Sequence, residues 1–574
     1  MSTNLFGLQI EGLDLALFLR AIRVAFVLTT LVGAALAARR GASEKRVSLI
    51  VLAVGMAGHA LAWFATMFPL PNVYGANGSM DRENHLGWAN VVALGFSPLR
   101  TFQVNHIHFE PVWPLLTAIA SGFNVDRVEL VFQIAPLFIG LALLITVRFA
   151  WSRNSDAGDE ARVEAAFAAL GALLLMSVPG DSEGRFRNPW ALTLLLKPNH
   201  ALGLVLSPLA ALALARARDW KSRIAAGFML QLVGWAFVIH MALFAAGLVV
   251  FTALSWIGKR RDRVRDLVDS AATVGLNLVM VSPYLAMLMV GYLFTNGSAH
   301  SRVAPMPERF IEGPLRMGTL LLLSGFGAWH AYHRRNRLGR ILASQWIAAH
   351  LAWQAFPILA VVGQAREEDE IFYWCRFWTG LFAGVGMFEG IRRLAGRARS
   401  ARALTPTGGL AAAALLLLLP SLLPAWWDPV SGDQYFVAAR EPIPDWIAEP
   451  TRFIRNETDP AAVFTGDRNY ARWIAAYGAR RVLLANSLNN PGDTKLRLRV
   501  EGAVLGDGAR DLLREGRTRY ALGYVLATSR PLEQATGLTL DMLRSKAHLR
   551  VVYDKEFSRS RVMIFRIEPE NPDR

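Results

Sequence analysis

The chain has 574 residues, 53% of them hydrophobic, and a formal net charge of +16. Its mean hydropathy of +0.30 is too apolar for a soluble protein averaged over this length. The single cysteine, Cys375, excludes an internal disulfide and a cysteine-based zinc site. Many of the arginines lie in short loops between apolar runs, which indicates membrane topology and not nucleic acid as a partner.

Long apolar runs predict a mainly α polytopic transmembrane helix bundle. A transmembrane helix needs roughly 20 apolar residues, and about twelve segments qualify. The first segment contains Arg20 and Arg23 and has no clear cleavage site, so we interpret it as a retained or interfacial helix and not a signal peptide. The candidate spans are 13–38, 47–68, 127–149, 163–178, 198–216, 223–240, 241–257, 267–293, 313–332, 341–363, 372–391 and 407–426.

The connections between these spans alternate in charge. Every second connection is basic, and the positive-inside rule places all of these in the cytoplasm. The other connections, together with the tail from Trp427, are then predicted to face outward. The basic connections are Arg39-Arg40 with Lys45-Arg46, Arg148 to Arg162, Arg216 to Arg223, Lys259 to Arg265, His333 to Arg340, and Arg392 to Arg402.

The first outward loop, residues 69–126, is too long for a plain connector. Its segment from Glu83 to Leu94 has apolar residues at helical spacing beside charged ones, which predicts a helix on the membrane surface. Its segment from Pro111 to Phe123 is apolar but too short to span, so we expect a re-entrant or interfacial helix.

The chain divides into a membrane domain, residues 1–426, and an extracytoplasmic α/β domain, residues 427–574. The tail has no Gly-rich phosphate loop and no nucleophile elbow, which favours a scaffold or recognition role over catalysis. Its residue pattern predicts strands at 462–464, 481–485, 520–527, 549–554 and 562–567, and helices at 469–476, 508–514 and 532–545.

The outward connections concentrate ionisable residues. Such groups at a membrane boundary are costly unless they are paired or functional. A carboxylate can accept a proton from an attacking hydroxyl, and Arg or Lys can hold a phosphate. Each residue alone also fits a solvated loop or a local packing role. Their placement on the same predicted side of the membrane is what favours a functional site. The candidates are Asp81, Glu83 and His85 (MDRENH), His106, His108 and Glu110 (NHIHFEP), Arg187, Lys197, His200, His240 and Arg376.

These features resemble the bacterial GT-C superfamily of membrane glycosyltransferases, akin to the protein O-mannosyltransferase and aminoarabinose-transferase groups. The resemblance rests on Asp81 followed by His85 in a long first outward loop, on the segment EPVWPL from Glu110, on KPNHALGLVLSPLAALAL, on a buried His240, and on IFYWCRFWTGLFAGVG. The tail resembles the periplasmic domains that close many such proteins. The N-terminus departs from the pattern, because Asp81 follows the second apolar segment and not the first.

The resemblance implies a protein of the bacterial cytoplasmic (inner) membrane with a periplasmic tail. It implies transfer of a sugar from a polyprenyl-phosphate donor to an extracytoplasmic acceptor, which could be a lipid, glycan or protein. Asp81 would be the counterpart of the acidic residue that the superfamily needs in its first loop, with Glu83 and His85 beside it. Some relatives use a divalent metal and others do not, so a metal held by these three residues stays open.

The remaining candidates take roles from their topology and charge. We expect Arg187, Lys197 and Arg376 to hold the carrier phosphate, and His106, His108, Glu110, His200 and His240 to line the substrate pocket. Two other functions remain open. A transporter or flippase would move a lipid or glycan without forming a bond, and it leaves the long loop and folded tail unexplained. A non-catalytic protein of glycan assembly or export could keep the fold without the chemistry.

Overall fold

The structure of the protein is a computed structural model. It describes residues 2–5, 8–11, 48–53, 55–56, 60, 80–104, 106, 110–153, 158–174, 198–294, 321–333, 336–362, 368–397, 443–485, 493–506, 508–529, 538–558 and 560–568. The chain forms two compact units. The helical unit comprises Met1–Leu70, Ala135–Ser282 and Ala299–Val437. The loop–tail unit comprises Pro71–Ile134, Pro283–Ser298 and Ala438–Arg574.

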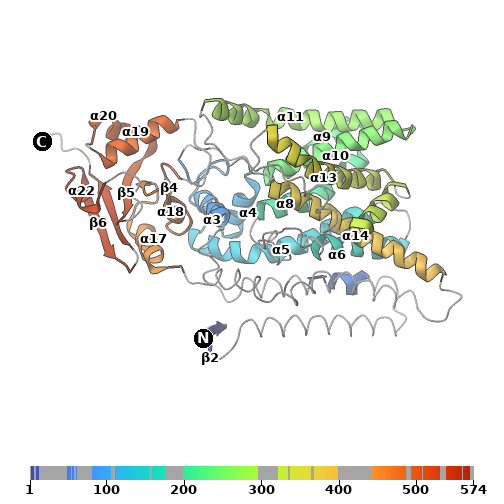
Figure 1. The fold of residues 1–574 in the computed structure, drawn as a ribbon, viewed down its shortest axis with the longest axis horizontal. Coiled ribbons are helices and arrows are strands. Elements are labelled where there is room, and N and C mark those ends of the chain that lie inside the picture. The colour runs from blue at the N-terminus through green and yellow to red at the C-terminus, as the bar shows by residue number, and fades with distance from the viewer. Residues whose placement is uncertain are drawn as a thin grey trace. The chain divides into compact units, whose positions relative to one another are not determined.

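Helices of the helical unit run side by side (Figure 1). The helices coincide closely with predicted spans. Each contains a long apolar run, and arginine or proline lies at the ends of many of these runs. These helices are α5 (Val125–Ser152, which starts in the loop–tail unit), α6 (Gly158–Leu174), α8 (Pro198–Arg216), α9 (Trp220–Ala236), α10 (Val238–Ile257), α11 (Arg263–Phe294, which ends in the loop–tail unit), α13 (Arg337–Val362) and α14 (Glu368–Arg397), with a further helix at 321–333. A short hairpin of β1 (Ser2–Leu5) and β2 (Leu8–Glu11) belongs to the same unit.

Helix α14 lies in the interior of this unit, and α6 packs along it. The two backbones approach at glycines: a Cβ at Gly171 would collide with the backbone of Gly380, and one at Gly384 with the backbone of Phe167. Small residues allow this close approach between membrane helices. Van der Waals packing drives the association of such helices, because the surrounding lipid is as apolar as their side chains. The packing leaves residues 373 to 389 of α14 buried on all sides.

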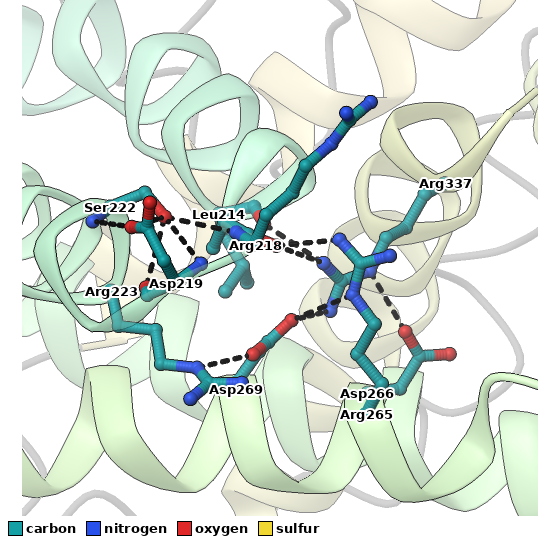
Figure 2. A network of polar contacts seen from close by, with 10 residues as sticks. Leu214, Arg218, Asp219, Ser222, Arg223, Arg265, Asp266, Asp269 and Arg337 are labelled. Carbon is teal, nitrogen blue, oxygen red and sulfur yellow. Dashed lines mark hydrogen bonds and ion pairs between the residues drawn. The ribbon is translucent and has the colours of Figure 1, made fainter.

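An ion-pair network joins three of the basic connections that the sequence places in the cytoplasm (Figure 2). Asp269 of α11 is fully buried and pairs with Arg223 Nε at 2.7 Å, Arg337 Nη2 at 2.7 Å and Arg265 Nε at 3.4 Å. Arg337 also donates from Nε to Asp266 at 2.8 Å. The start of α9, the start of α11 and the start of α13 therefore lie at one end of the bundle.

Further contacts bring other basic connections to one another. Asn336 donates to the backbone oxygen of Arg153 at 3.4 Å, and the Ser48 hydroxyl donates to the backbone oxygen of Arg162 at 3.2 Å. The end of α10 joins the network through Ser255, which donates to Asp266 at 2.8 Å. This grouping agrees with the alternation of loop charge along the chain.

Helices α9 and α10 form a hairpin, because the start of α9 and the end of α10 both reach this network. The chain reverses at Phe237, which has extended backbone (φ −158°, ψ 114°) between Ala236 and Val238. We expected the reversal at His240. The extended residue comes three positions earlier, so His240 lies in the first turn of α10.

By length and composition, three helical segments among the residues that the structure describes could cross a membrane: Ile134–Ser152, Asn199–Arg216 and Val238–Ile257. The expected twelve spans are therefore not confirmed, and two of them, 13–38 and 407–426, fall outside those residues. The fold is mainly helical with a small sheet, as the sequence predicts.

The tail part of the loop–tail unit is α/β, as expected. Its sheet has the order β4-β3-β5-β7-β6, in which β3 pairs in parallel with β4 and β5, and β7 pairs antiparallel with β5 and β6. The elements are α17 (Asp445–Glu457), β3 (Val463–Gly466), α18 (Ala471–Ala476), β4 (Arg481–Val482), α19 (Thr494–Leu505), α20 (Arg510–Tyr520), β5 (Leu522–Thr528), α22 (Leu540–Arg544), β6 (Leu549–Glu556) and β7 (Arg561–Ile567).

The loop part of this unit contains helices α3 (Met80–Ala93) and α4 (Val112–Ala120). Both were expected. Residues 83 to 93 of α3 are buried, however, whereas a helix on a membrane surface would leave one face free of protein. Helix α3 packs against α4 and against α18 of the tail. The boundary that we predict between residues 426 and 427 lies outside the described residues.

Candidate functional site

Helix α3 carries the three residues predicted to be catalytic. Successive residues of an α-helix are 100° apart, so side chains three or four positions apart share a face and those two apart do not. Asp81, His85 and Trp88 therefore occupy one face, and the His85 ring meets the Trp88 ring edge to face at 4.8 Å. Glu83 occupies the opposite face of the helix. By the helical repeat, position 81 thus shares a face of α3 with His85 and not with Glu83.

The other acidic candidate of the first loop, Glu110, directly precedes Pro111 and helix α4. Glu83, His85 and Glu110 are each buried, with exposures of 6%, 5% and 7%. Buried ionisable groups are retained in folded proteins only where hydrogen bonds or charge partners offset the loss of water. Glu83 and His85 on α3 and Glu110 just before α4 are therefore the buried ionisable candidates of the loop–tail unit.

His106 lies near Arg497 and Asp493 of the tail, and its pKa is lowered. Its Nδ1 lies 3.2 Å from the Thr101 hydroxyl. Burial and, to a smaller extent, the Arg497 guanidinium lower the pKa of His106 to about 4, against the opposing effect of the Asp493 carboxylate. A neutral imidazole beside a buried arginine suits a packing role against α19. The pocket role that we expect for His106 stays a prediction.

In the helical unit, the predicted outer ends of α8, α10 and α14 converge on two histidines. The His200 ring lies 5.7 Å from the His240 ring, edge to face, although the two residues are on different helices. His200 stacks on Phe237 at 3.6 Å and meets Tyr373 at 5.9 Å. His240 packs against Trp374 at 4.9 Å. The structure therefore brings these two pocket candidates together inside an aromatic cluster.

His240 is fully buried, and neither of its ring nitrogens has a hydrogen-bond partner among the residues that the structure describes. A Cβ at Gly203 would meet its Nδ1 at 2.5 Å, so the ring sits against the backbone of α8. Leaving a buried polar group unsatisfied costs about 1–3 kcal/mol. A ring that is fixed by aromatic neighbours and still has a free donor and acceptor is equipped to bind a polar ligand.

Arg376 adds a positive charge to the same part of the helical unit. It lies on α14 three residues after Tyr373, which places the two residues on one face of that helix. Its exposure is 2%. A buried arginine in an apolar bundle is costly and by default marks a functional position. Its planar guanidinium matches the oxygens of a phosphate in a bidentate arrangement.

The remaining candidates, His108, Arg187 and Lys197, lie outside the described residues, so their predicted roles stay predictions. Within the part of the chain that is described, no group of three or more His, Cys, Asp or Glu residues could hold a metal ion. Asp81, Glu83 and His85 do not fit as one ligand set, because the helical repeat places Glu83 on the opposite face of α3.

Three aromatic residues of this site were not predicted: Phe237, Tyr373 and Trp374. All three surround the histidines, and two of them stand in the segment IFYWCRFW that the family resemblance already includes. The density of aromatic residues in the predicted span 372–391 was the feature of the sequence that could have identified Tyr373 and Trp374. It does not distinguish a site from ordinary core packing, because aromatic residues also fill helix interfaces.

Comparisons with known proteins give similar structures. No family model matches the chain, and no curated protein matches it. The chain is similar to the crystal structure of the apo oligosaccharyltransferase of Archaeoglobus fulgidus, with 13% identity, a TM-score of 0.49, and coverage of 84% of this chain and 69% of that chain. The same archaeal enzyme, AglB, in complex with an inhibitory peptide and a dolichol-phosphate, gives 12% identity, a TM-score of 0.48 and the same coverage.

A second similar structure is the arabinofuranosyltransferase AftD from mycobacteria. It gives 14% identity, a TM-score of 0.47, and coverage of 90% of this chain and 40% of that chain. With TM-scores below 0.5, these matches assign no donor, acceptor or residue role to this chain.

Proposed function

We propose that the protein is an integral-membrane glycosyltransferase that moves a sugar from a polyprenyl-phosphate donor to an extracytoplasmic acceptor. The observation that carries the proposal is the cluster in the helical unit. Two buried histidines, His200 of α8 and His240 of α10, lie among aromatic residues, two of which belong to α14, the helix that also carries the buried Arg376. An aromatic wall suits an isoprenoid chain, and the cation and ring nitrogens suit its phosphate.

The carrier phosphate is the leaving group in this reaction. The bond between the sugar C1 and the phosphate oxygen breaks, and the phosphate leaves with the bonding electron pair. Arg376, with Arg187 and Lys197 from the outward connection that precedes α8, neutralises the charge that grows on that oxygen. Such preorganised charge typically lowers a barrier by several kcal/mol, since removing one donor costs about 2.7–4 kcal/mol.

Asp81 acts on the acceptor in this proposal. Its carboxylate takes the proton from the attacking group as the new bond to the sugar forms, a role typically worth roughly 10²–10⁴ in rate. His85 lies one helical turn away on the same face of α3 and orients it. Glu83 and Glu110 are the remaining acidic groups of the loop, and a divalent metal beside Asp81 and His85 stays part of the proposal.

Replacement of Asp81 by Asn tests the proposal. Asn is nearly isosteric but takes no proton, so the variant should lose the product while it still binds a polyprenyl phosphate and keeps its thermal stability. Product is measured by mass spectrometry of lipid and envelope extracts from a deletion strain that carries each variant. Asp126→Asn is the matched control, because Asp126 is a carboxylate of the same loop with 79% of its side chain accessible. Its ion pair with Arg455 at 2.7 Å is a surface contact, of a kind worth about 0–1 kcal/mol.

Wild-type product from the Asp81→Asn strain would rule out Asp81 as the base and make Glu83 or Glu110 the next candidate. An extract of the deletion strain that is identical to wild type in every glycolipid and glycan would rule out the transferase itself.

A further inference from the structure

The first outward loop and the C-terminal tail share a single compact unit, although most of the helical bundle separates them in sequence. Helix α3 lies beside α18 in Figure 1. Asn90 of α3 is 2% exposed, and its side-chain amide donates to the backbone oxygens of Ala475 at 3.1 Å and Ala476 at 2.8 Å. These are the last two carbonyls of α18, which the helix itself leaves without partners.

A second contact fixes how closely α3 approaches α18. Gly87 faces the tail, and a Cβ at this position would lie 2.9 Å from the Ala475 Cβ and 2.9 Å from the Phe102 ring. Glycine therefore permits a helix separation that alanine would not. Gly87 and Asn90 are three residues apart, so both lie on one face of α3.

The face of α3 that docks on the tail is the one opposite Asp81. Asp81 and His85 lie about half a turn away from Gly87 and Asn90 by the 100° repeat of the helix. The docking contacts therefore set the rotation of α3 about its axis, and with it the direction in which the backbone presents residue 81.

The loop also extends the tail sheet. Residues 102–104 run parallel to β4, the edge strand: Val482 donates its N–H to Phe102 O at 2.9 Å, and Val104 donates its N–H to Val482 O at 3.0 Å. The Val104 side chain is part of the hydrophobic core of the tail. An exposed edge strand is a site for strand addition, and here the loop occupies it.

A buried arginine joins the loop and the tail at this edge. Arg497 of α19 is fully buried and donates to the backbone oxygens of Leu483, at 2.8 Å, and Val104. Its Nε donates to Asp493 at 2.6 Å. The positive charge is thereby balanced, and its hydrogen bonds connect the first loop with β4 and α19.

We propose that the C-terminal α/β domain is the positioning element for the candidate catalytic helix, with Asn90 and Arg497 as its positioning residues. The role of Asp81 in this statement rests on the proposed function. A catalytic group must be held within a fraction of an ångström of its productive position, and a displacement of about 1 Å can cost 10²-fold in rate. The loop lacks a β-sheet of its own in its described residues, and the tail supplies the sheet edge and core that hold it.

Cysteine cross-linking in native membranes tests the docking. Gln103 and Val482 are bridge partners across the sheet edge, so Gln103→Cys with Val482→Cys should form a disulfide under mild oxidation. The only other cysteine, Cys375, is buried in the helical unit. A protease site placed at residues 154–157 cuts the chain between the two positions, and the fragments should stay together on a non-reducing gel.

The matched control pairs Gln103→Cys with Met542→Cys. Met542 is 45% exposed on α22, which packs on β6 at the opposite edge of the sheet, so no cross-link is expected. Cross-linking of the control pair alone, or of neither pair, would overturn the docking whatever reaction the protein catalyses.

A second experiment separates positioning from general stability. Asn90→Leu keeps the branched side-chain shape but removes the two hydrogen bonds to α18, whereas Met563→Ala opens a cavity in buried strand β7 on the far side of β5. Asn90→Leu should lower product about 10²-fold and speed hydrogen exchange in residues 80–93. Met563→Ala should lower the thermal midpoint at least as far while it keeps product and exchange in α3 near wild type. Both variants should bind a polyprenyl phosphate normally.

Wild-type product in Asn90→Leu, or equal loss of product in both variants, would overturn the positioning role. If Asp81→Asn keeps its product, the proposed function fails separately from the positioning proposal. Hydrogen-exchange rates in α3 then decide the positioning proposal. Faster exchange in Asn90→Leu but not in Met563→Ala supports it, and any other pattern refutes it.

Discussion

Arg337 and Asp269 form an ion pair at 2.7 Å between the starts of helices α13 and α11, in the interior of the network that Figure 2 shows. The carboxylate is fully buried and the arginine side chain is 10% exposed. Because Asp269 also pairs with Arg223 and Arg265, one carboxylate holds cations from three connections of the bundle. This network holds the starts of α9, α11 and α13 together.

We expect Asp269→Asn to destabilise the helical unit. The change removes the carboxylate charge that pairs with Arg223 and leaves Arg337 with Asp266 alone, and breaking a buried pair typically costs about 3–5 kcal/mol. The thermal midpoint in detergent should fall, while polyprenyl-phosphate binding per folded molecule should be retained. Asp262→Asn is the control, since Asp262 is exposed in the same connection. Equal midpoints for the two variants would show that the network contributes little.

The sidedness of the chain gives a second prediction. The basic connections that the network groups should be cytoplasmic, and the tail should be periplasmic. A reporter that is active only outside the cytoplasm should be active when fused after Arg574 and inactive when fused within 154–157. A well-expressed but inactive fusion after Arg574 would refute the predicted topology, and the shared outward side of the candidate residues with it.

The positions of most helices could be predicted from the sequence, because an apolar run bounded by Pro198 and Arg216 leaves few alternatives for α8. Helix α19 could not. Its residues Leu496, Leu498 and Val500 alternate with basic residues as in a strand. The helix forms because Arg497 reaches the carbonyls of the loop and Val500 enters the tail core, and neither contact is visible in the local pattern.

The candidate site could be predicted only in part for the same reason. His85 and His240 are ionisable residues next to apolar ones, so both can be recognised as candidates from the sequence. The docking of Asn90 on Ala475 joins positions 385 residues apart, and no local signal records it. Gly87 likewise looks like an ordinary helix-weakening glycine until the distance to the tail is known.

The loop–tail unit should lose stability in mild acid through His106. Its folded pKa of about 4 lies below the ordinary value of 6.5, so the unfolded chain binds a proton more readily. Stability is therefore fully present above pH 6.5 and falls as the pH drops toward 4. The thermal midpoint should show this fall in wild type and less of it in His106→Gln. His333→Gln, an exposed histidine of the helical unit, is the control; the same pH profile in all three proteins would contradict the assignment.

The last prediction concerns the carrier phosphate. Arg376→Met and Lys197→Met keep side-chain length and remove a cation, so each should weaken binding of a polyprenyl phosphate. A lost charge-assisted hydrogen bond is worth about 1.5–3 kcal/mol, or roughly 10- to 150-fold in affinity.

His240→Phe keeps the ring between Phe237 and Trp374 but removes both nitrogens. It should weaken binding while it raises thermal stability, because the buried unsatisfied nitrogens are gone. Arg261→Met, an exposed arginine of the α10–α11 connection, is the matched control. Binding is measured with a fluorescent polyprenyl phosphate in detergent. Affinities equal to the control in all three variants would place the carrier phosphate elsewhere, whereas a loss confined to Lys197→Met would assign it to the preceding outward connection and leave the histidine cluster to packing.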